Sequence, residues 1–250
     1  MTRGRRDGRR AGLVRPRLRR PTIDRMPLVA AISIGQTPRP DLIEELLAVL
    51  PDGVEVREYG ALDGIEPASI PQIRFDAENP LSTRLVDGRQ TIVDEPWIAP
   101  HLQVAVDRAE TDGAEASLLL CAAGFDQLRA TRPVVRPSWV VAETLIARGV
   151  QGALVVVPSG RQIRASEAKW RALGLDPLML GTPLPKGIDD VVEAAGDVPA
   201  VILDYVGHPG KLVDRLEDEL EAETDALLYD LGRYGAYAVV ELLAAAGTAR

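Results

Sequence analysis

The feature that most limits what this chain can fold into is an alternation of short apolar runs with longer amphipathic stretches. Residues 28–35 and 153–157 are almost entirely apolar, as strands are when both faces of a parallel sheet are covered. Between such runs, apolar residues recur at helical spacing, as Leu212, Leu216 and Leu220 do. The alternation predicts an α/β fold in which helices flank parallel sheets.

The limits of the elements follow from the same pattern and from its breaks at glycine and proline. The strands that we expect are residues 28–35, 54–61, 83–86, 90–93, 116–122, 153–157, 178–180, 200–203 and 226–229. The helices that we expect are residues 41–50, 95–112, 137–148, 166–173, 188–195 and 234–246, and one helix around Leu216. Asp87 and Gly88 separate the third and fourth strands, which is a strong signal for a hairpin turn.

The pattern begins a second time after the third expected helix. In each part the first strand runs into a polar loop with a glycine, Gly35 in one and Gly160 in the other. We therefore expect two pseudo-symmetric halves, residues 27–149 and 150–250, with a closing helix that can pack back on the first half. Ligands of such sheets bind beyond the carboxyl ends of the strands, so the site is expected in the cleft between the halves.

The net charge of −8 combines two unlike parts. Residues 1–25 contain ten arginines and two acidic residues, a charge of +8, which leaves −16 on the rest. Because an apolar run suited to a first strand follows Met26 directly, we interpret residues 1–26 as a disordered basic leader or a mis-annotated start. A body with this negative charge repels phosphate, so no nucleic-acid partner is expected.

The distribution of hydrophobic residues also indicates where in the cell the protein is expected. No apolar run approaches the roughly 20 residues that cross a bilayer. The leader lacks the apolar core of a secretory signal. We expect a cytoplasmic protein without a membrane partner, with a homodimer as an open alternative.

Composition and motifs limit the chemistry as well. One cysteine and two histidines exclude a disulfide framework and leave too few soft ligands for a zinc site. No G-x-G-x-x-G follows the first strand, and the pair Gly210-Lys211 lacks the earlier glycine of a Walker loop because position 205 is tyrosine. We therefore expect no metal and no cofactor.

Cys121 is the sharpest catalytic candidate. It stands at the end of an expected strand, and the small residues Ala122, Ala123 and Gly124 that follow allow backbone N–H groups to approach a ligand. Such surroundings can lower the pKa of a thiol and create a thiolate nucleophile or base. Free cysteines are also among the most buried residues, so inert packing is the alternative.

Two polar loops are candidates for binding a carboxylate. The first contains Gly35, Gln36, Thr37 and Arg39, and its counterpart in the second half contains Ser159, Gly160, Arg161 and Gln162. Donors at a helix N-terminus hold anions, and arginine binds a carboxylate through two parallel hydrogen bonds. The alternative is that these residues only begin the helices that follow them.

Three polar residues follow a later strand of the second half. Asp204, Tyr205 and His208 are expected to face the same cleft as Cys121, and a histidine can act as acid or base near neutral pH. Each of them alone is more often a cap or a surface residue. His101, inside an expected helix, is interpreted as structural or solvent-facing.

Several segments spread in order over residues 28–243 resemble the AroM family. They are residues 32–41, 58–64, 83–88, 119–125, 137–138, 169–170 and 203–207. That family is similar to the aspartate/glutamate/hydantoin racemase superfamily, which implies two pseudo-symmetric halves with a cofactor-free active site between them. The resemblance also implies either two catalytic cysteines, one from each half, that exchange a proton at the carbon next to a carboxylate, or one cysteine that acts as nucleophile or proton donor in isomerases and decarboxylases. Of the two cysteine positions, Cys121 matches the first, whereas the second is Tyr205.

The missing second thiol narrows the expected function. A two-cysteine racemase needs an acid and a base on opposite faces of one carbon, and a phenol is a poor base at neutral pH. We therefore predict a cofactor-independent isomerase or lyase, such as a decarboxylase, that acts on a small carboxylic acid with a single cysteine. Tyr205, Asp204 and His208 are the candidates to replace the second thiol. A carboxylate-binding or regulatory protein that has lost catalysis is the alternative.

Overall fold

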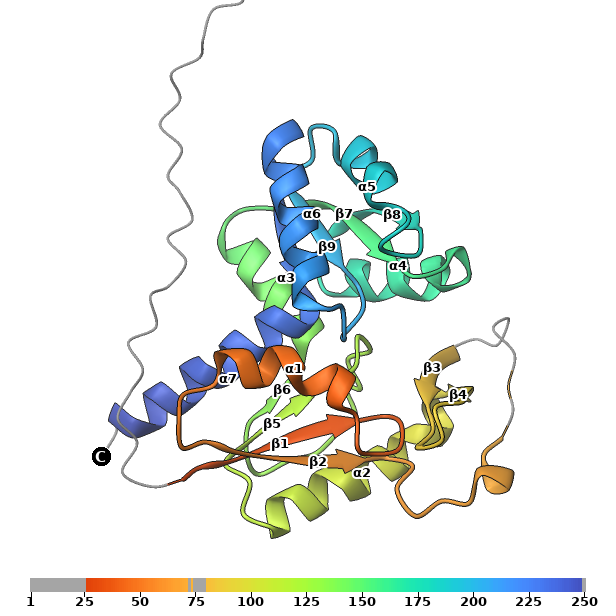
Figure 1. Cartoon of the computed structure of the whole chain (residues 1–250), viewed down its shortest axis with the longest axis vertical. Coiled ribbons are helices and arrows are strands. Elements are labelled where there is room, and N and C mark those ends of the chain that lie inside the picture. Colours follow the sequence, from red (N-terminus) through yellow and green to blue (C-terminus); the bar gives the residue numbers. More distant parts are fainter. Residues whose placement is uncertain (1–25, 72, 74–79, 249–250) are drawn as a thin grey trace, which may run out of the picture.

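The computed structural model describes residues 26–71, 73 and 80–248, so the expected leader before Met26 lies outside the described residues. A four-stranded parallel sheet forms the centre of each half (Figure 1). The strands are β1 (Leu28–Ser33), β2 (Glu55–Gly60), β5 (Ala116–Leu119) and β6 (Val134–Val135) in the first sheet, and β7 (Gly152–Val157), β8 (Asp176–Gly181), β9 (Ala200–Leu203) and β10 (Leu227–Asp230) in the second.

The two sheets have the same topology. Their spatial orders are β2-β1-β5-β6 and β10-β9-β7-β8, so each places its first strand between its second and third. Every pairing within them is parallel. A separate antiparallel hairpin consists of β3 (Pro80–Arg84) and β4 (Gln90–Asp94). The expected α/β fold with two similar parallel sheets is confirmed.

Helices flank both sheets (Figure 1). They are α1 (Pro40–Val49), α2 (Glu95–Thr111), α3 (Pro137–Ala147), α4 (Ile163–Ala172), α5 (Ile188–Ala195), α6 (Gly210–Glu223) and α7 (Leu231–Thr248), with short 3-10 turns at Pro67–Ser69 and Gly160–Gln162. Two of the three apolar positions expected on α6, Leu216 and Leu220, are buried. The third buried position is Val213, and Leu212 is only half-buried.

One strand limit matters for the site. The sequence predicts a strand over residues 116–122, but β5 ends at Leu119. Leu120 still donates its N–H to the carbonyl of Ile32 at 2.7 Å, and the chain then leaves the sheet. Cys121 therefore stands at the start of a loop beyond the carboxyl end of β5, and its buried surroundings explain why this stretch resembles a strand in sequence.

Helix α7 ends the described chain, yet it packs on the first half. It contacts α1, α3 and β5 of that half as well as β10 of its own. Gly235 permits this close approach, because a Cβ atom there would lie 2.8 Å from Leu118 and 3.0 Å from Pro137. One buried core cluster accordingly joins residues of both sheets with α7, for example Val155 and Val239. This shared core holds the two halves together.

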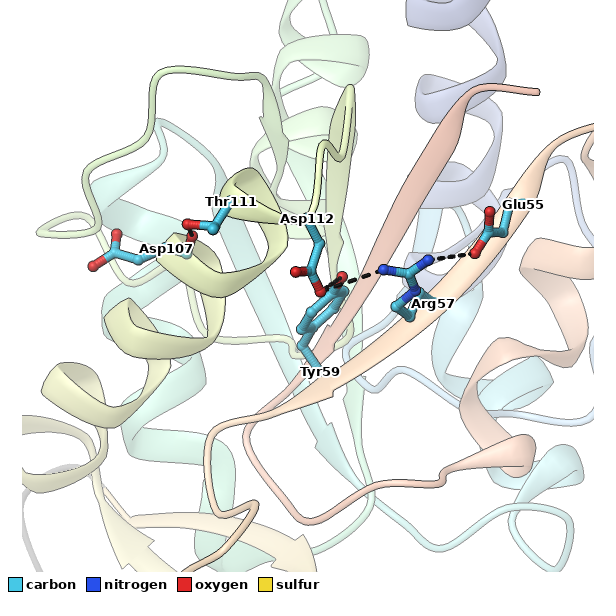
Figure 2. Close-up of polar contacts among 6 residues, drawn as sticks. All are labelled: Glu55, Arg57, Tyr59, Asp107, Thr111 and Asp112. Carbon is cyan, nitrogen blue, oxygen red and sulfur yellow. Dashed lines mark hydrogen bonds and ion pairs between the residues drawn. The ribbon is translucent and has the colours of Figure 1, made fainter. Parts of the chain in front are cut away.

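A network of hydrogen bonds and ion pairs, in which the charged side chains are exposed and the tyrosine is buried, connects the end of α2 to strand β2 (Figure 2). Tyr59 donates its hydroxyl hydrogen to Asp112 Oδ2 at 2.9 Å, and Arg57 reaches the same oxygen at 3.3 Å. Arg57 also donates to Glu55 at 2.7 Å. We call Glu55, Arg57, Tyr59 and Asp112 the edge network.

Among the residues that the structure describes, none of the helices combines the length and the apolar character that a membrane span requires.

Candidate active site

A cavity of about 400 Å³ lies between the two halves, at the carboxyl ends of β5, β7 and β9. The first half lines it with residues 122–127 after β5, with Glu95 at the start of α2, and with Trp139 of α3. The second half lines it with Val157 at the end of β7, with Asp204 after β9, and with one face of α4. This is the place at which parallel sheets bind ligands.

A larger groove, of about 760 Å³, is lined by α2 together with residues 127–131. Because its walls are one helix and one loop of the first half, it lacks the position at strand ends that makes the interdomain cavity a candidate site. In the part of the chain that the structure describes, no group of three or more His, Cys, Asp or Glu side chains is arranged to hold a metal ion.

Three polar residues of the second half form a compact group on the cavity wall. Ser166 and Lys169 are three positions apart on α4, so their side chains share one face of the helix. Ser166 donates its hydroxyl hydrogen to Asp204 Oδ2, and Lys169 Nζ donates to Asp204 Oδ1. Lys169 Nζ also donates to the carbonyl oxygen of Ala122, at 2.9 Å. This last bond crosses the cleft. We call Ser166, Lys169 and Asp204 the cleft cluster.

Cys121 directly precedes the loop that forms the opposite wall, and it is not one of the residues that line the cavity. Its side chain is buried, with only 8% of the residue exposed, and packs in the core of the first half. Burial raises the pKa of this thiol to about 11, while the N–H of Ala123 and the positive charge of Lys169 act in the lowering direction. The thiol is therefore protonated at neutral pH, which is the opposite of the lowered pKa that the sequence suggested.

A second ionisable group of the cavity also resists ionisation. Glu95 is the first residue of α2, and burial raises the pKa of its carboxyl. The negative charges of Asp126 and Asp94 act in the same direction. Of these three carboxyl groups, those of Glu95 and Asp126 belong to residues that line the cavity. The first-half wall is thus rich in carboxyl groups.

Gly124 is required by the packing of the cavity wall. A Cβ atom at this position would lie 2.9 Å from Trp139 Nε1 and 3.0 Å from Asp126 Oδ1. The Trp139 ring is held from its other side by Arg136, whose guanidinium carbon lies 4.7 Å from the ring centroid. Arg136 also donates to the carbonyl of Gly124 at 2.9 Å. The glycine lets the indole close one end of the cavity.

The structure places the first expected carboxylate-binding loop outside the cavity. The amide of Gln36 donates to the carbonyls of Leu62 and Ile65 and accepts from Val86. Thr37 donates both its N–H and its hydroxyl to Asp63, each at 2.8 Å.

The two ends of this loop have structural partners too. Arg39 is a buried guanidinium that donates to both carboxylate oxygens of Asp41, at 2.9 and 2.8 Å. Gly35 lies against the hairpin, because a Cβ atom there would lie 2.5 Å from the carbonyl of Arg84. The donors that the sequence offered to a ligand are thus used to fasten the loop, and its residues do not line the cavity.

The second expected loop is only partly in place. Gln162 lines the cavity. Ser159 accepts a hydrogen bond from the N–H of Arg161 at 3.3 Å, which caps the short turn that they begin. Gly160 packs against Gly181, where a Cβ atom would lie only 2.5 Å from the Gly160 Cα atom. These three residues therefore shape the turn rather than the cavity wall.

The three candidates after β9 separate in the structure. Asp204 lines the cavity, whereas Tyr205 and His208 lie together outside its wall with their ring centroids 5.0 Å apart. Gly207 between them has φ +108° and lies against Leu42 of α1. Burial lowers the pKa of His208 to about 4, so its imidazole is neutral at pH 7. His101, expected to be structural, contacts the ring of Trp97 with centroids 4.7 Å apart.

The structure therefore brings Ala123, Gly124, Gln162 and Asp204 to one cavity, and Cys121 directly precedes the loop that forms one of its walls. It also adds cavity residues that were not predicted, namely Glu95, Asp126, Gln127, Trp139, Ser166 and Lys169. For Lys169 the sequence held a signal. The chain has 26 arginines and only three lysines, so a lysine here is an exception to the bias of the whole protein.

Comparisons with known proteins agree with this arrangement. No curated protein matches the chain. Among solved structures, it is similar to allantoin racemase from Klebsiella pneumoniae, with TM-score 0.58, 16% identity, and coverage of 88% of this chain and 89% of the other. It is also similar to an arylmalonate decarboxylase, with TM-score 0.58, 16% identity and coverage of 86% and 92%. Maleate isomerase Iso from Pseudomonas putida S16 gives TM-score 0.57, 11% identity and coverage of 88% and 94%.

The TM-scores show that the chain shares the fold of these proteins, and identities this low say nothing of its reaction. A protein-family model gives the closer assignment. The model described as "AroM protein" matches residues 29–223, which include both sheets up to β9, the cavity and the cleft cluster. The chain belongs to the AroM protein family.

Proposed function

We propose that the protein is a cofactor-independent isomerase or lyase, such as a decarboxylase, that acts on a small carboxylic acid with Cys121 as its single catalytic thiol. The observation that carries this proposal is the position of Cys121. Cys121 directly precedes Ala122, which lines the cavity and accepts a hydrogen bond from Lys169 of the other half. The solved structures of similar fold include a racemase, an isomerase and a decarboxylase.

The protonation of Cys121 favours one role for it. Removing a proton or carbon dioxide from the carbon next to a carboxylate leaves an electron pair on that carbon, spread into the carboxylate as an enolate. A thiol with a pKa of about 11 holds a proton at neutral pH and can give it to this carbon. The thiolate then regains a proton from solvent. Cys121 therefore fits a proton donor better than a resting thiolate nucleophile.

The cavity wall supplies donors for the enolate oxygens. Residues 122–124 and Gln162 line the cavity, and we assign this role to the side-chain amide of Gln162 and to the backbone N–H groups of this loop that do not bond to Cys121. Fixed donors of this kind stabilise negative charge as it develops, because they need no reorganisation during the reaction. Removal of the first proton, where the reaction requires it, falls to a carboxylate of the same cavity, with Glu95 as the candidate, because both oxygens of Asp204 already accept hydrogen bonds.

Solvent deuterium incorporation tests the proposal. Phenylmalonate, phenylacetate, maleate and aspartate are incubated with the protein in D₂O and analysed by mass spectrometry. We expect wild type to label or decarboxylate at least one of these acids and Cys121→Ala to lose at least ~100-fold of that rate. Equal rates in the two proteins would remove Cys121 from the mechanism.

A binding or regulatory protein remains the second candidate function. The observation in its favour is that Tyr205, at the place of a second thiol, lies outside the cavity beside His208. A protein of this kind binds small carboxylates but never labels them. Calorimetric binding of an acid that takes up no deuterium over days would favour this candidate.

A further inference from the structure

The ammonium group of Lys169 has a donor to spare. A lysine carries three N–H donors. Two of those of Lys169 are used, by Asp204 and by the carbonyl of Ala122. Its Nζ also lies 4.9 Å from the centroid of the Trp170 ring, a weaker contact than a hydrogen bond to an oxygen. No further oxygen accepts from it among the described residues, and its side chain lines the cavity with 19% of its surface exposed. The third N–H is therefore available to a ligand oxygen.

The two bonds that Lys169 makes also fix where that oxygen would lie. The carbonyl of Ala122 belongs to the residue after Cys121, so the ammonium is tied to the loop that carries the thiol. Asp204, whose side chain is only 3% exposed, holds the ammonium from the other side and is itself held by Ser166. A flexible side chain is thus fixed before any ligand arrives, and such preorganisation strengthens binding.

The charges of the cavity restrict the ligand further. Lys169 is the one basic side chain among the described residues that line it, against the carboxyl groups of Glu95, Asp126 and Asp204. The nearby Arg136 packs on the Trp139 ring and donates to backbone carbonyls. A ligand with one carboxylate finds one cation, whereas a second carboxylate would face carboxyl groups.

We propose that Lys169 is the residue that binds the carboxylate that the ligand keeps through the reaction. The cavity then holds a monocarboxylate more tightly than a dicarboxylate, because a second carboxylate, such as one lost as carbon dioxide, faces carboxyl groups. Asp204 and Ser166 are positioning residues for Lys169. The inference rests on the proposed function only in placing the ligand beside Cys121. The charge-assisted hydrogen bond from Lys169 to the ligand carboxylate would hold the neighbouring carbon of the ligand near the loop that follows Cys121.

The single cysteine allows a test without knowledge of the substrate. Iodoacetate carries one carboxylate and iodoacetamide carries none, and both alkylate a thiolate by displacing iodide. The ratio of their rates at Cys121 cancels the fraction of thiolate and reports recognition of the carboxylate alone. We expect Lys169→Met to lower this ratio by about tenfold or more, since a hydrogen bond to a charged group is lost.

Two further variants complete this experiment. Lys169→Gln keeps a polar side chain of similar length and should lower the ratio by a comparable factor, which covers the case in which Lys169→Met does not fold. Lys211→Met removes an exposed lysine of α6 and should leave the ratio unchanged. An unchanged ratio in both Lys169 variants, or a wild type in which neither reagent reaches Cys121, would overturn the assignment.

The selectivity for one carboxylate is tested on wild type alone. Phenylacetate, phenylacetamide and phenylmalonate are compared as protectants of Cys121 against iodoacetamide at pH 8. We expect phenylacetate to protect at a concentration about tenfold lower than either of the others needs. Equal or better protection by phenylmalonate would contradict the selectivity, and equal protection by phenylacetamide would contradict the role of Lys169.

Failure of this inference and failure of the proposed function give different results. If the protein prefers iodoacetate in a way that depends on Lys169 but incorporates no deuterium into any acid, Lys169 is supported as the carboxylate-binding residue and the proposed enzymatic activity is contradicted. If deuterium incorporation depends on Cys121 but the preference for iodoacetate is absent, the enzymatic activity is supported and the role of Lys169 in binding the carboxylate is contradicted.

Discussion

The edge network and the cleft cluster are built from the same kinds of group but differ in their contact with water. In the edge network, the side chains of Arg57 and Asp112 are 45% and 43% exposed. In the cleft cluster, those of Lys169 and Asp204 are 19% and 3% exposed. Water screens the first pair, so its net contribution to stability is small. The second pair has lost most of its hydration, so each charge depends on its partner.

The two groups also differ in what they connect. The edge network joins β2 to the end of α2 within the first half. The cleft cluster joins α4 and the end of β9 in the second half to the carbonyl of Ala122 in the first. Buried charge is costly to keep, and here it lies at the cavity and beside the thiol. The cleft cluster therefore keeps its charges away from water at the proposed site, whereas the edge network keeps its charges in contact with water.

The largest expected effect comes from breaking the buried pair on one side. Lys169→Met leaves the Asp204 carboxylate buried without its cation, with Ser166 as its remaining partner. Removing one partner of a buried ion pair costs about 3–5 kcal/mol. We expect a loss of this size in the free energy of unfolding measured by urea denaturation at pH 7.

A double variant separates lost packing from an unpaired charge. In Lys169→Met/Asp204→Asn both charges are gone, so the protein should recover a substantial part of the stability that Lys169→Met lost. If the free energies of unfolding lost in Lys169→Met and in Asp204→Asn instead sum to the loss in the double variant, that additivity would show that the two charges are not coupled. The contrast with the edge network would then fail.

The next effect concerns His208, a partly buried imidazole that has no charged partner among the residues that the structure describes. Burial lowers the pKa of His208 from 6.5 to about 4, so the folded protein keeps this imidazole neutral while the unfolded chain takes up a proton below pH 6.5. Stability is therefore lost as the pH falls from about 6.5 towards 4. His208→Phe keeps a ring beside Tyr205 and removes the titration.

Urea denaturation of both proteins at pH 7 and at pH 4.5 measures this effect. Carboxyl groups titrate in both, so the difference between the two proteins isolates the imidazole. We expect His208→Phe to gain on wild type as the pH falls. A difference that stays constant with pH would mean that the imidazole is not held neutral by burial.

A smaller effect links the charges of the cavity to the thiol. The negative charge of Glu95 raises the pKa of Cys121, and the positive charge of Lys169 lowers it. Glu95→Gln should therefore increase the rate of iodoacetamide alkylation a few-fold at pH 8, and Lys169→Gln should decrease it. In wild type the rate should still be rising at pH 10, because the pKa is about 11. A plateau below pH 9 would contradict the raised pKa.

The fold could be predicted because strands covered on both faces leave a direct trace in the sequence. The helix at Ile188–Ala195 and the strand at Ala200–Leu203 have the predicted limits. Strand β6 was missed, since the two residues Val134–Val135 are too few to show a period. The strand before Cys121 was predicted too long, because buried loop residues are as apolar as strand residues.

The site could be predicted where it follows from strand ends, and not where it depends on how two halves meet. Gly124 and Asp204 were found from their places after β5 and β9. The rarity of lysine singled out Lys169 in the sequence, but its contact with Ala122 could not be predicted, because that contact requires α4 to lie across the cleft from Ala122. Arg39 was predicted to bind a ligand, but its carboxylate partner is Asp41 of the same chain.

The smallest effect is expected at the edge network, and it is the other half of the comparison. Arg57→Met removes a guanidinium that is shared between Glu55 and Asp112. Tyr59 keeps its own hydrogen bond to Asp112, and the methionine side chain can cover the same apolar surface. We expect the urea midpoint and the iodoacetate preference of Cys121 both to remain at their wild-type values. A loss of stability as large as that of Lys169→Met would mean that exposure to water does not distinguish the two networks.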